Sequence, residues 1–141
     1  DFYLSTKSAR QVLPSEVPMK DAVFNISHAA MMVAAFARGS EKHLVNAFAD
    51  ALHQNYRAPL IPGMFDVFAA AKKAGAYGAA LSGAGPCLIA FVPEHRKCTE
   101  AVAAAMQDVF RAHEIEARPL HLRLDTKGAR VLRRRDMNPK R

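Results

Sequence analysis

The stretch YGAALSGAGPCLIAFV, residues 77–92, decides the fold class of this 141-residue chain. Its two apolar runs, Tyr77–Leu81 and Cys87–Val92, are short and rich in small or aliphatic side chains, and Ser82-Gly83-Ala84-Gly85-Pro86 separates them. Short apolar runs on both sides of a glycine-rich turn are typical of neighbouring strands. We therefore expect two strands of an antiparallel sheet, joined by a tight loop.

Helical patterns surround this pair of strands. We expect helices at Lys7–Val12, Met19–Arg38, Glu41–Leu52, Met64–Ala74 and Lys97–His113. In the longest one, an apolar side chain recurs every three or four residues and forms one stripe, made of Val23, Ile26, Ala30, Val33 and Ala37. The connection NYRAPLIPG, residues 55–63, holds two prolines and a glycine, and we expect it to be a rigid loop.

The C-terminal part adds two further strand patterns. Leu120, Leu122 and Leu124 alternate with polar residues, which indicates a strand with one buried face. Residues 128–132 are expected to form a short last strand. The order of helices followed by strand, loop, strand, helix and strand predicts an α+β fold, with a ferredoxin-like antiparallel sheet and helices on one face.

The net charge of +7 raises the question of nucleic acid, because basic surfaces attract polyanions. Residues 133–141, RRRDMNPKR, hold five basic residues and one Asp, so this basic tail carries +4 of the charge, and we expect it to be disordered. The body has no basic stretch interleaved with stacking aromatic residues, which argues against specific nucleic-acid binding. It also has neither a run of about 18 apolar residues nor a signal peptide, and we expect a cytoplasmic protein without a membrane partner.

Metal and nucleophilic chemistry find little support in the sequence. Cys87 and Cys98 stand eleven positions apart without a second pair of ligands, so we expect no metal site. Both cysteines have apolar sequence neighbours, and we expect buried free thiols. The six histidines show no metal-ligand spacing, and no Ser-His-Asp or Cys-His arrangement can be proposed. His28 and Asn25 on the long helix are only weak polar candidates.

The loop Ser82–Pro86 is the first place where a ligand could bind. Gly83 and Gly85 permit positive φ angles and leave room for a ligand near the backbone. Successive exposed N–H groups in such a loop can bind an anion. A strand connection that needs glycine only in order to turn explains the same residues. The loop is not a P-loop, because the Gly-Lys-Ser/Thr ending is absent.

Two further candidates are Thr6 with Arg10, and Arg57. If the segment after Thr6 is helical, its hydroxyl and the Arg10 guanidinium lie one turn apart on one face and could hold an anionic ligand. Arg57 stands in a proline-stiffened segment, and its guanidinium suits a two-point grip on a carboxylate. The alternatives are a helix N-cap at Ser5 or Thr6 and arginines that are merely solvated.

Taken together, these places resemble one family. The strings LSTKSARQVLP (4–14), KDAVFNISHAA (20–30), YRAPLIPG (56–63) and GAALSGAGP (78–86) are similar, in order and spacing, to the C-terminal half of bacterial homoserine kinases. The ending LDTKGARVL, residues 124–132, is also similar, so the resemblance covers nearly the whole chain. Ser-Gly-Ala-Gly-Pro alone indicates only the wider GHMP group of small-molecule kinases. The strings around Arg10 and Arg57 narrow the resemblance to homoserine kinases.

The resemblance implies a role for each candidate residue. Arg10 and Arg57 match positions that hold the homoserine carboxylate, and Thr6 matches a threonine near the site of phosphoryl transfer. The loop positions that match the third GHMP motif, which packs by the phosphate loop and the active centre, are Ser82, Gly83 and Gly85. Members of the family use ATP and Mg²⁺ to convert L-homoserine to O-phospho-L-homoserine in threonine biosynthesis.

The resemblance also implies that part of such an enzyme is missing. The phosphate-cradling loop of the family, the acidic metal ligand and the groups that bind the substrate amine are absent from these 141 residues. We therefore expect residues 1–132 to be a GHMP kinase C-terminal domain, inactive alone, whose partner is an N-terminal ATP-binding domain; a homodimer is left open. Two alternatives stay open, another GHMP small-molecule kinase and a non-enzymatic ferredoxin-like ligand-binding module.

Overall fold

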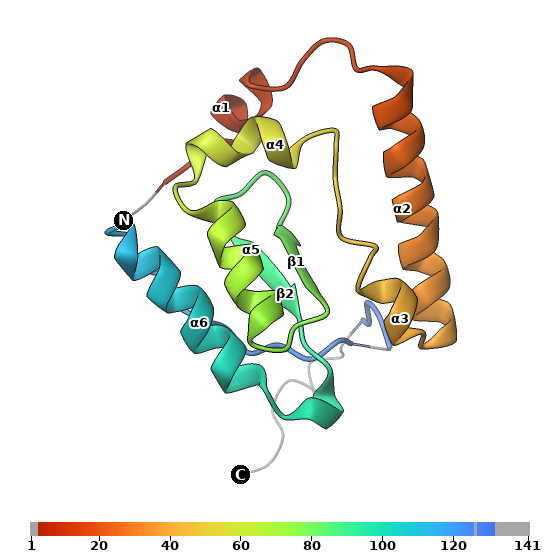
Figure 1. Cartoon of the computed structure of the whole chain (residues 1–141), viewed down its shortest axis with the longest axis vertical. Coiled ribbons are helices and arrows are strands. Elements are labelled where there is room, and N and C mark those ends of the chain that lie inside the picture. The colour runs from red at the N-terminus through yellow and green to blue at the C-terminus, as the bar shows by residue number, and fades with distance from the viewer. Residues whose placement is uncertain (1–2, 126, 132–141) are drawn as a thin grey trace.

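The computed structural model describes residues 3–125 and 127–131 (Figure 1). The elements in chain order are α1 (Thr6–Gln11), α2 (Met19–Arg38), α3 (Glu41–Leu44), α4 (Gln54–Arg57), the 3-10 helix η1 (Ala58–Leu60), α5 (Met64–Lys73), β1 (Gly78–Leu81), β2 (Leu88–Phe91), the 3-10 helix η2 (Glu94–Arg96) and α6 (Thr99–Ala112). The predicted α+β class is confirmed, since helices surround an antiparallel sheet. No helix in the described ranges has the length and apolar character needed to cross a membrane.

The core lies on one face of the sheet. β1 and β2 pair so that Gly78 is opposite Phe91 and Leu81 is opposite Leu88. Because side chains alternate along a strand, Ala79 and Leu81 share a face. The layer formed by α5 and α6 covers that face, as Figure 1 shows. Two clusters of buried side chains fill the space between, made of Ile61, Met64, Val67, Leu81 and Phe110, and of Ala71, Ala76, Ala79 and Val102.

The other face of the sheet meets the arm formed by α2 and α3. Phe91 points to this side, with its ring centroid 5.7 Å from that of Phe36 and 5.2 Å from that of Phe48. The Phe48 ring also packs against Gly78, where any Cβ would collide with it. Figure 1 shows α2 standing apart from α5 and α6, with α3 at its C-terminal end.

The apolar stripe of α2 lies on the exposed side of that helix. Val23 is 57 % exposed, Ile26 70 % and Val33 71 %, while Ala30 and Ala37 are exposed as well. A solvated helix face normally carries charged and polar side chains. The arrangement therefore leaves α2 with an apolar surface that the described part of the chain does not cover.

Two predicted boundaries around residue 50 are wrong. α3 forms only the first turn of the helix expected at 41–52, and the expected loop at 55–63 contains α4 and η1. The reason for the second difference is the carboxylate of Asp50, whose Oδ2 accepts the backbone N–H groups of His53 (2.8 Å) and Gln54 (2.7 Å). An acceptor placed at this point satisfies N–H groups that have no partner within a helix, so a new helix starts there.

The same carboxylate ties α2 to α4. Asn25 Nδ2 donates to Asp50 Oδ1 (2.6 Å), and Asn25 Oδ1 accepts the N–H of Ala51 (2.7 Å). Burial of Asp50 by itself raises its pKa, but the hydrogen bonds from the N–H of Gln54, from Asn25 and from the N–H of His53 outweigh burial and lower the pKa below its usual value. Asp50 is thus an ionised anchor between two distant segments.

The predicted strands at the C-terminal end are wrong for the described residues. Neither Leu120–Leu124 nor 128–131 is part of a sheet. The three leucines are 64–83 % exposed. Alternation alone does not make a strand, because its backbone groups also need a neighbouring strand. Leu132 and the basic tail 133–141 lie outside the described residues.

The two loop glycines face different surroundings. A Cβ at Gly85 would lie 2.9 Å from Ile61 Cδ1 and 3.0 Å from Leu81 Cδ1, inside the core. A Cβ at Gly83 would meet no atom within 4 Å. Both residues have positive φ, +61° at Gly83 and +87° at Gly85. Gly85 is therefore needed for packing, whereas Gly83 faces open space.

We predict that Gly85→Ala lowers the free energy of unfolding more than Gly83→Ala. Both substitutions pay roughly 1–2 kcal/mol for a left-handed alanine, and only Gly85→Ala adds about 1–3 kcal/mol for overpacking the core. Urea unfolding of the two variants beside the unchanged chain measures the difference. Equal losses for the two variants would contradict these placements.

A second prediction concerns acid. Because the native pKa of Asp50 is lowered, its contribution is complete above the pKa of about 4 that an unfolded aspartate has and is lost as pH falls through the native value. Asp50→Asn should lower the free energy of unfolding at pH 7 by about 1.5–3 kcal/mol. Its difference from the unchanged chain should shrink in acid. Asp66→Asn is the control, because Asp66 is exposed on α5 and makes only a 3.6 Å surface contact with His113, and it should lower stability at pH 7 by less than Asp50→Asn.

Candidate functional site

Helix α1 has an exposed side, which carries two of the predicted residues, and a buried side that faces the rest of the chain. Ser5 is the N-cap, since its Oγ accepts the N–H of Ser8 (3.0 Å), so the Thr6 hydroxyl is left free of that task. Thr6 and Arg10 are exposed, and their spacing of four residues puts them on one face of the helix. Ala9 is fully buried on the inner side. The predicted pair of hydroxyl and guanidinium groups is thus displayed together, outward.

Arg57 joins three segments that are distant in sequence. Its Nε donates to the carbonyl oxygen of Ala9 on α1 (3.0 Å), and its Nη1 donates to the carbonyl oxygen of Gly83 in the loop (3.1 Å). Nη1 also lies 3.3 Å from Nδ1 of His53, one turn earlier. The structure thereby brings α1, α4 and the loop Ser82–Pro86 together at one side chain.

The charge of Arg57 has no counter-charge among the described residues. The residue is only 9 % exposed, and its partners are two carbonyl oxygens and an imidazole nitrogen. None of the salt bridges found in residues 3–125 and 127–131 includes it, and its Nη2 has no acceptor there. Removing a guanidinium from water is costly unless an anion or further acceptors compensate. The site is therefore suited to an anion, and a carboxylate matches the geometry of a guanidinium.

The loop beside Arg57 closes on itself and leaves two donors open. Ser82 N–H donates to the carbonyl of Cys87 (2.8 Å), and Gly85 N–H donates to the carbonyl of Ser82 (3.1 Å). Within the described ranges the N–H groups of Gly83 and Ala84 have no acceptor. Adjacent free N–H groups favour an anion. Cys87, which we expected to be buried, is an exposed free thiol, since it stands where the chain leaves this loop.

Sequence reasoning missed the residues that support the site. Gln54 is 5 % exposed, and its Oε1 accepts the N–H of Leu81, which fixes the end of β1 next to the loop. His53 contacts Arg57, and Asp50 in turn contacts His53. Asn25, which was only a weak candidate in the sequence, donates a hydrogen bond to Asp50. Asp50 stands four residues before α4, which is not the position of an N-cap, so no helix-start pattern marked it in the sequence. A hollow of about 190 Å³ lies among Asn25, Asp50, His53 and Gln54.

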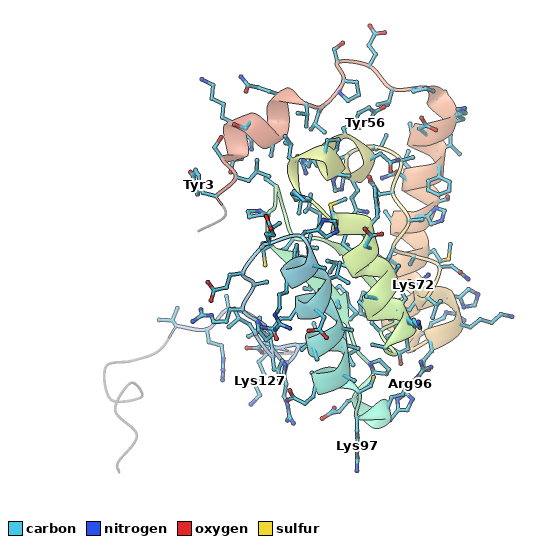
Figure 2. All side chains as sticks on the ribbon, turned by 60° about the vertical axis from the view of Figure 1, so that its left-hand side comes forward. Tyr3, Tyr56, Lys72, Arg96, Lys97 and Lys127 are labelled. Atoms are coloured by element: carbon cyan, nitrogen blue, oxygen red, sulfur yellow. The ribbon has the colours of Figure 1, made fainter. Side chains whose placement is uncertain are left out.

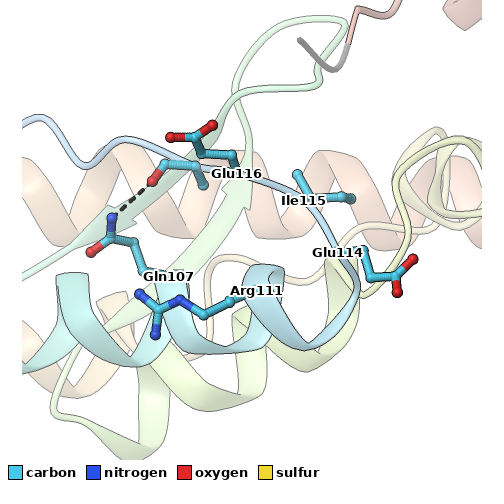
Figure 3. Close-up of a pocket in the computed structure, with 6 residues that line it drawn as sticks. Gln107, Arg111, Glu114, Ile115 and Glu116 are labelled. Atoms are coloured by element: carbon cyan, nitrogen blue, oxygen red, sulfur yellow. Dashed lines mark hydrogen bonds between the residues drawn. The ribbon is translucent and has the colours of Figure 1, made fainter.

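A larger hollow lies away from the predicted residues. It measures about 390 Å³ and lies at the C-terminal end of α6 (Figure 3), with Gln107 Nε2 donating to the carbonyl of Ala117 (2.8 Å). None of the predicted site residues lines it. Figure 2 shows a second polar region, Arg96 and Lys97, at the end of the molecule opposite Tyr56 of α4. There Arg96 pairs with Glu41 (3.3 Å) and lies over the Tyr77 ring, which gives this region a structural explanation.

Comparison with known proteins agrees with these observations. The C-terminal family of GHMP kinases matches residues 32–112. The homoserine kinase of Desulfitobacterium hafniense is 43 % identical over 132 residues, which are 94 % of this chain and 44 % of that protein. The homoserine kinase of Gloeobacter violaceus is 52 % identical over 106 residues, 75 % of this chain and 35 % of that protein.

A solved structure gives the same result. The crystal structure of homoserine kinase from Cytophaga hutchinsonii superposes with a TM-score of 0.73 at 29 % identity, covering 79 % of this chain and 35 % of that one. The chain spans less than half the length of these relatives and aligns to their C-terminal part. By sequence and by fold, this chain belongs to the GHMP kinase family, and it corresponds to the C-terminal part of homoserine kinases.

Proposed function

We propose that this chain is the substrate-binding part of an ATP-dependent homoserine kinase, which forms O-phospho-L-homoserine in threonine biosynthesis. The observation that carries the proposal is the buried Arg57 guanidinium, which has no counter-charge among the described residues and joins α1 to the glycine loop. Homoserine supplies a carboxylate for it. The homoserine kinases that this chain resembles support the choice of substrate.

In this proposal Arg10 and Arg57 hold the homoserine carboxylate together. The Nε and Nη1 nitrogens of Arg57 already donate to the carbonyls of Ala9 and Gly83. Arg57 therefore binds the carboxylate mainly through Nη2. Arg10, which is exposed on α1, supplies the second set of donors. A carboxylate fixed at two points orients the substrate hydroxyl toward the phosphoryl donor, which removes part of the entropic barrier.

The loop and Thr6 would act at the other end of the substrate. Phosphoryl transfer depends on positioning and on stabilising charge at the transferred group. The open N–H groups of Gly83 and Ala84 are donors of the required kind, with Ser82 and Gly85 shaping the loop that holds them. The Thr6 hydroxyl, free of the capping role, is in our proposal the group of this chain nearest to the reacting centre.

ATP and Mg²⁺ are assigned mainly to an N-terminal half. The described residues hold no group of three His, Cys, Asp or Glu side chains that could bind a metal ion. Mg²⁺ is commonly bound by one or two carboxylates together with the phosphates of the nucleotide, and in this proposal the N-terminal half supplies those carboxylates. We propose residues 1–132 as the C-terminal domain of a two-domain enzyme.

The exposed stripe of α2 supports the same division. The relatives are more than twice as long as this chain, so a homoserine kinase has a further part that can pack against the apolar side of α2. We propose that the N-terminal half covers the side of α2 that carries Val23, Ile26 and Val33. A homodimer through this helix is the competing occupant.

This chain alone should not phosphorylate homoserine, because it lacks the phosphate-cradling loop of the family. The measurement is ADP release from ATP and L-homoserine by the purified 141-residue protein, with the full-length enzyme at equal concentration as the positive control. Turnover by the chain alone would contradict the two-domain proposal.

Analytical ultracentrifugation of the chain and of a Val33→Glu variant tests which protein covers the apolar surface of α2. A dimer that Val33→Glu abolishes would favour the homodimer.

In the full-length enzyme, Arg10→Lys and Arg57→Lys should raise KM for homoserine much more than KM for ATP. Lysine keeps the positive charge but loses the planar donor fork, and a hydrogen bond to a charged group is worth roughly 1.5–3 kcal/mol. Arg57→Lys should also lower stability, since it breaks the contacts with Ala9 and Gly83. Steady-state kinetics with each substrate varied measures the split.

Normal homoserine binding in both variants, with ATP binding lost, would refute the carboxylate assignment. Lys7→Gln, a charge change at another exposed position of α1, is the matched control and should leave both KM values near those of the unchanged enzyme. If the full-length protein acts on another alcohol instead of homoserine, the chain belongs to a different GHMP small-molecule kinase. If it binds homoserine or another ligand without any turnover, the non-enzymatic alternative holds.

A further inference from the structure

A row of polar side chains runs from α2 to the guanidinium of Arg57. Asn25 donates to Asp50 Oδ1 (2.6 Å), and the same oxygen lies 3.5 Å from His53 Nε2. On the far side of the imidazole, Nδ1 lies 3.3 Å from Arg57 Nη1. The Asp50 side chain is 8 % exposed and that of His53 36 %, so the carboxylate is buried while the imidazole is partly open to water.

The chemistry of these groups fixes the direction of each contact. A guanidinium nitrogen can only donate, so His53 Nδ1 must accept from Arg57. The proton of the neutral imidazole then lies on Nε2, which faces the Asp50 carboxylate. A carboxylate on one ring nitrogen selects the tautomer that presents a lone pair at the other. Asp50 in turn is held by Asn25 and by the backbone N–H groups at the start of α4.

We propose that His53, oriented by Asp50, is a positioning residue that holds the Arg57 guanidinium in the plane in which it receives the substrate carboxylate. This inference rests on the proposed role of Arg57. His53 touches no substrate in this proposal, and it acts only through Arg57. The carbonyls of Ala9 and Gly83 constrain Nε and one N–H of Nη1, and the imidazole constrains the group from a third direction. A guanidinium held from three directions loses less entropy when it binds its ligand.

The geometry makes a distinction between two substitutions of similar size. The side-chain oxygen of Asn occupies nearly the position of Nδ1 in His, so His53→Asn keeps the acceptor for Arg57. Gln places its oxygen nearer to the position of Nε2, so His53→Gln loses that acceptor. A residue that only fills space would not separate these two variants according to which ring nitrogen they imitate.

The test uses the full-length enzyme with His53→Asn, His53→Gln and His53→Ala. We expect His53→Gln and His53→Ala to raise KM for homoserine about tenfold, which is the loss of one modest hydrogen bond, with KM for ATP unchanged. His53→Asn should stay near the unchanged enzyme. In the Arg57→Lys background, His53→Ala should add little, because the two residues act as one unit. His43→Gln, at an exposed position on α3 that contacts Ser40, is the control.

A second readout does not depend on turnover. NMR of the enzyme labelled with ¹⁵N-arginine, with the Arg57 Nη–H signals identified by their loss in Arg57→Lys, reports how firmly the edge of the guanidinium that faces His53 is held. These protons should exchange with solvent faster in His53→Gln and His53→Ala and at the unchanged rate in His53→Asn. Equal exchange in all variants overturns the positioning role, whatever the substrate is. An enzyme that fails to turn over homoserine but shows this exchange pattern contradicts the proposed function and leaves the role of His53 standing.

Discussion

The buried guanidinium of Arg57 is the constraint on which the site depends. It takes one backbone carbonyl from α1 and one from the glycine loop, while its own helix is started by Asp50. The sheet itself is small, because β1 and β2 are short and pair only with each other among the described residues, and it contacts α4 through the hydrogen bond from the Leu81 N–H to Gln54. A side chain with five donors in a rigid fork can satisfy several carbonyls and still offer a free edge. In the proposed function, the fold and the ligand therefore use the same group.

Much of the fold could be predicted from the sequence because it is decided locally. Gly39, with φ of +62°, ends α2 where the pattern ends, and Ser5 caps α1. The glycine loop between two apolar runs is a local signal as well. The predictions that failed depend on distant partners. A helix starts at Gln54 because the Asp50 carboxylate accepts the N–H groups there, and Leu120–Leu124 has the alternation of a strand without a neighbour to pair with.

The same distinction applies to the site. Thr6, Arg10, Arg57 and the loop were found by their residue types and by family resemblance, and the structure gathers α1, Arg57 and the loop at one place. The sequence could not show that two nitrogens of Arg57 donate to backbone carbonyls, because these carbonyls belong to residues 26 and 48 positions away. Asp50, His53 and Gln54 were missed for that reason. Their roles are defined by what they face.

The central claim is that the free edge of Arg57 and the exposed Arg10 receive the carboxylate of homoserine. A crystal structure of the full-length enzyme with L-homoserine and a non-hydrolysable ATP analogue tests it most directly. The account predicts the carboxylate at hydrogen-bond distance, about 3 Å, from Arg57 Nη2 and from the Arg10 guanidinium, with the contacts to Ala9 and Gly83 kept. A carboxylate bound to other cations, with Arg57 still enclosed by its carbonyls, would contradict it.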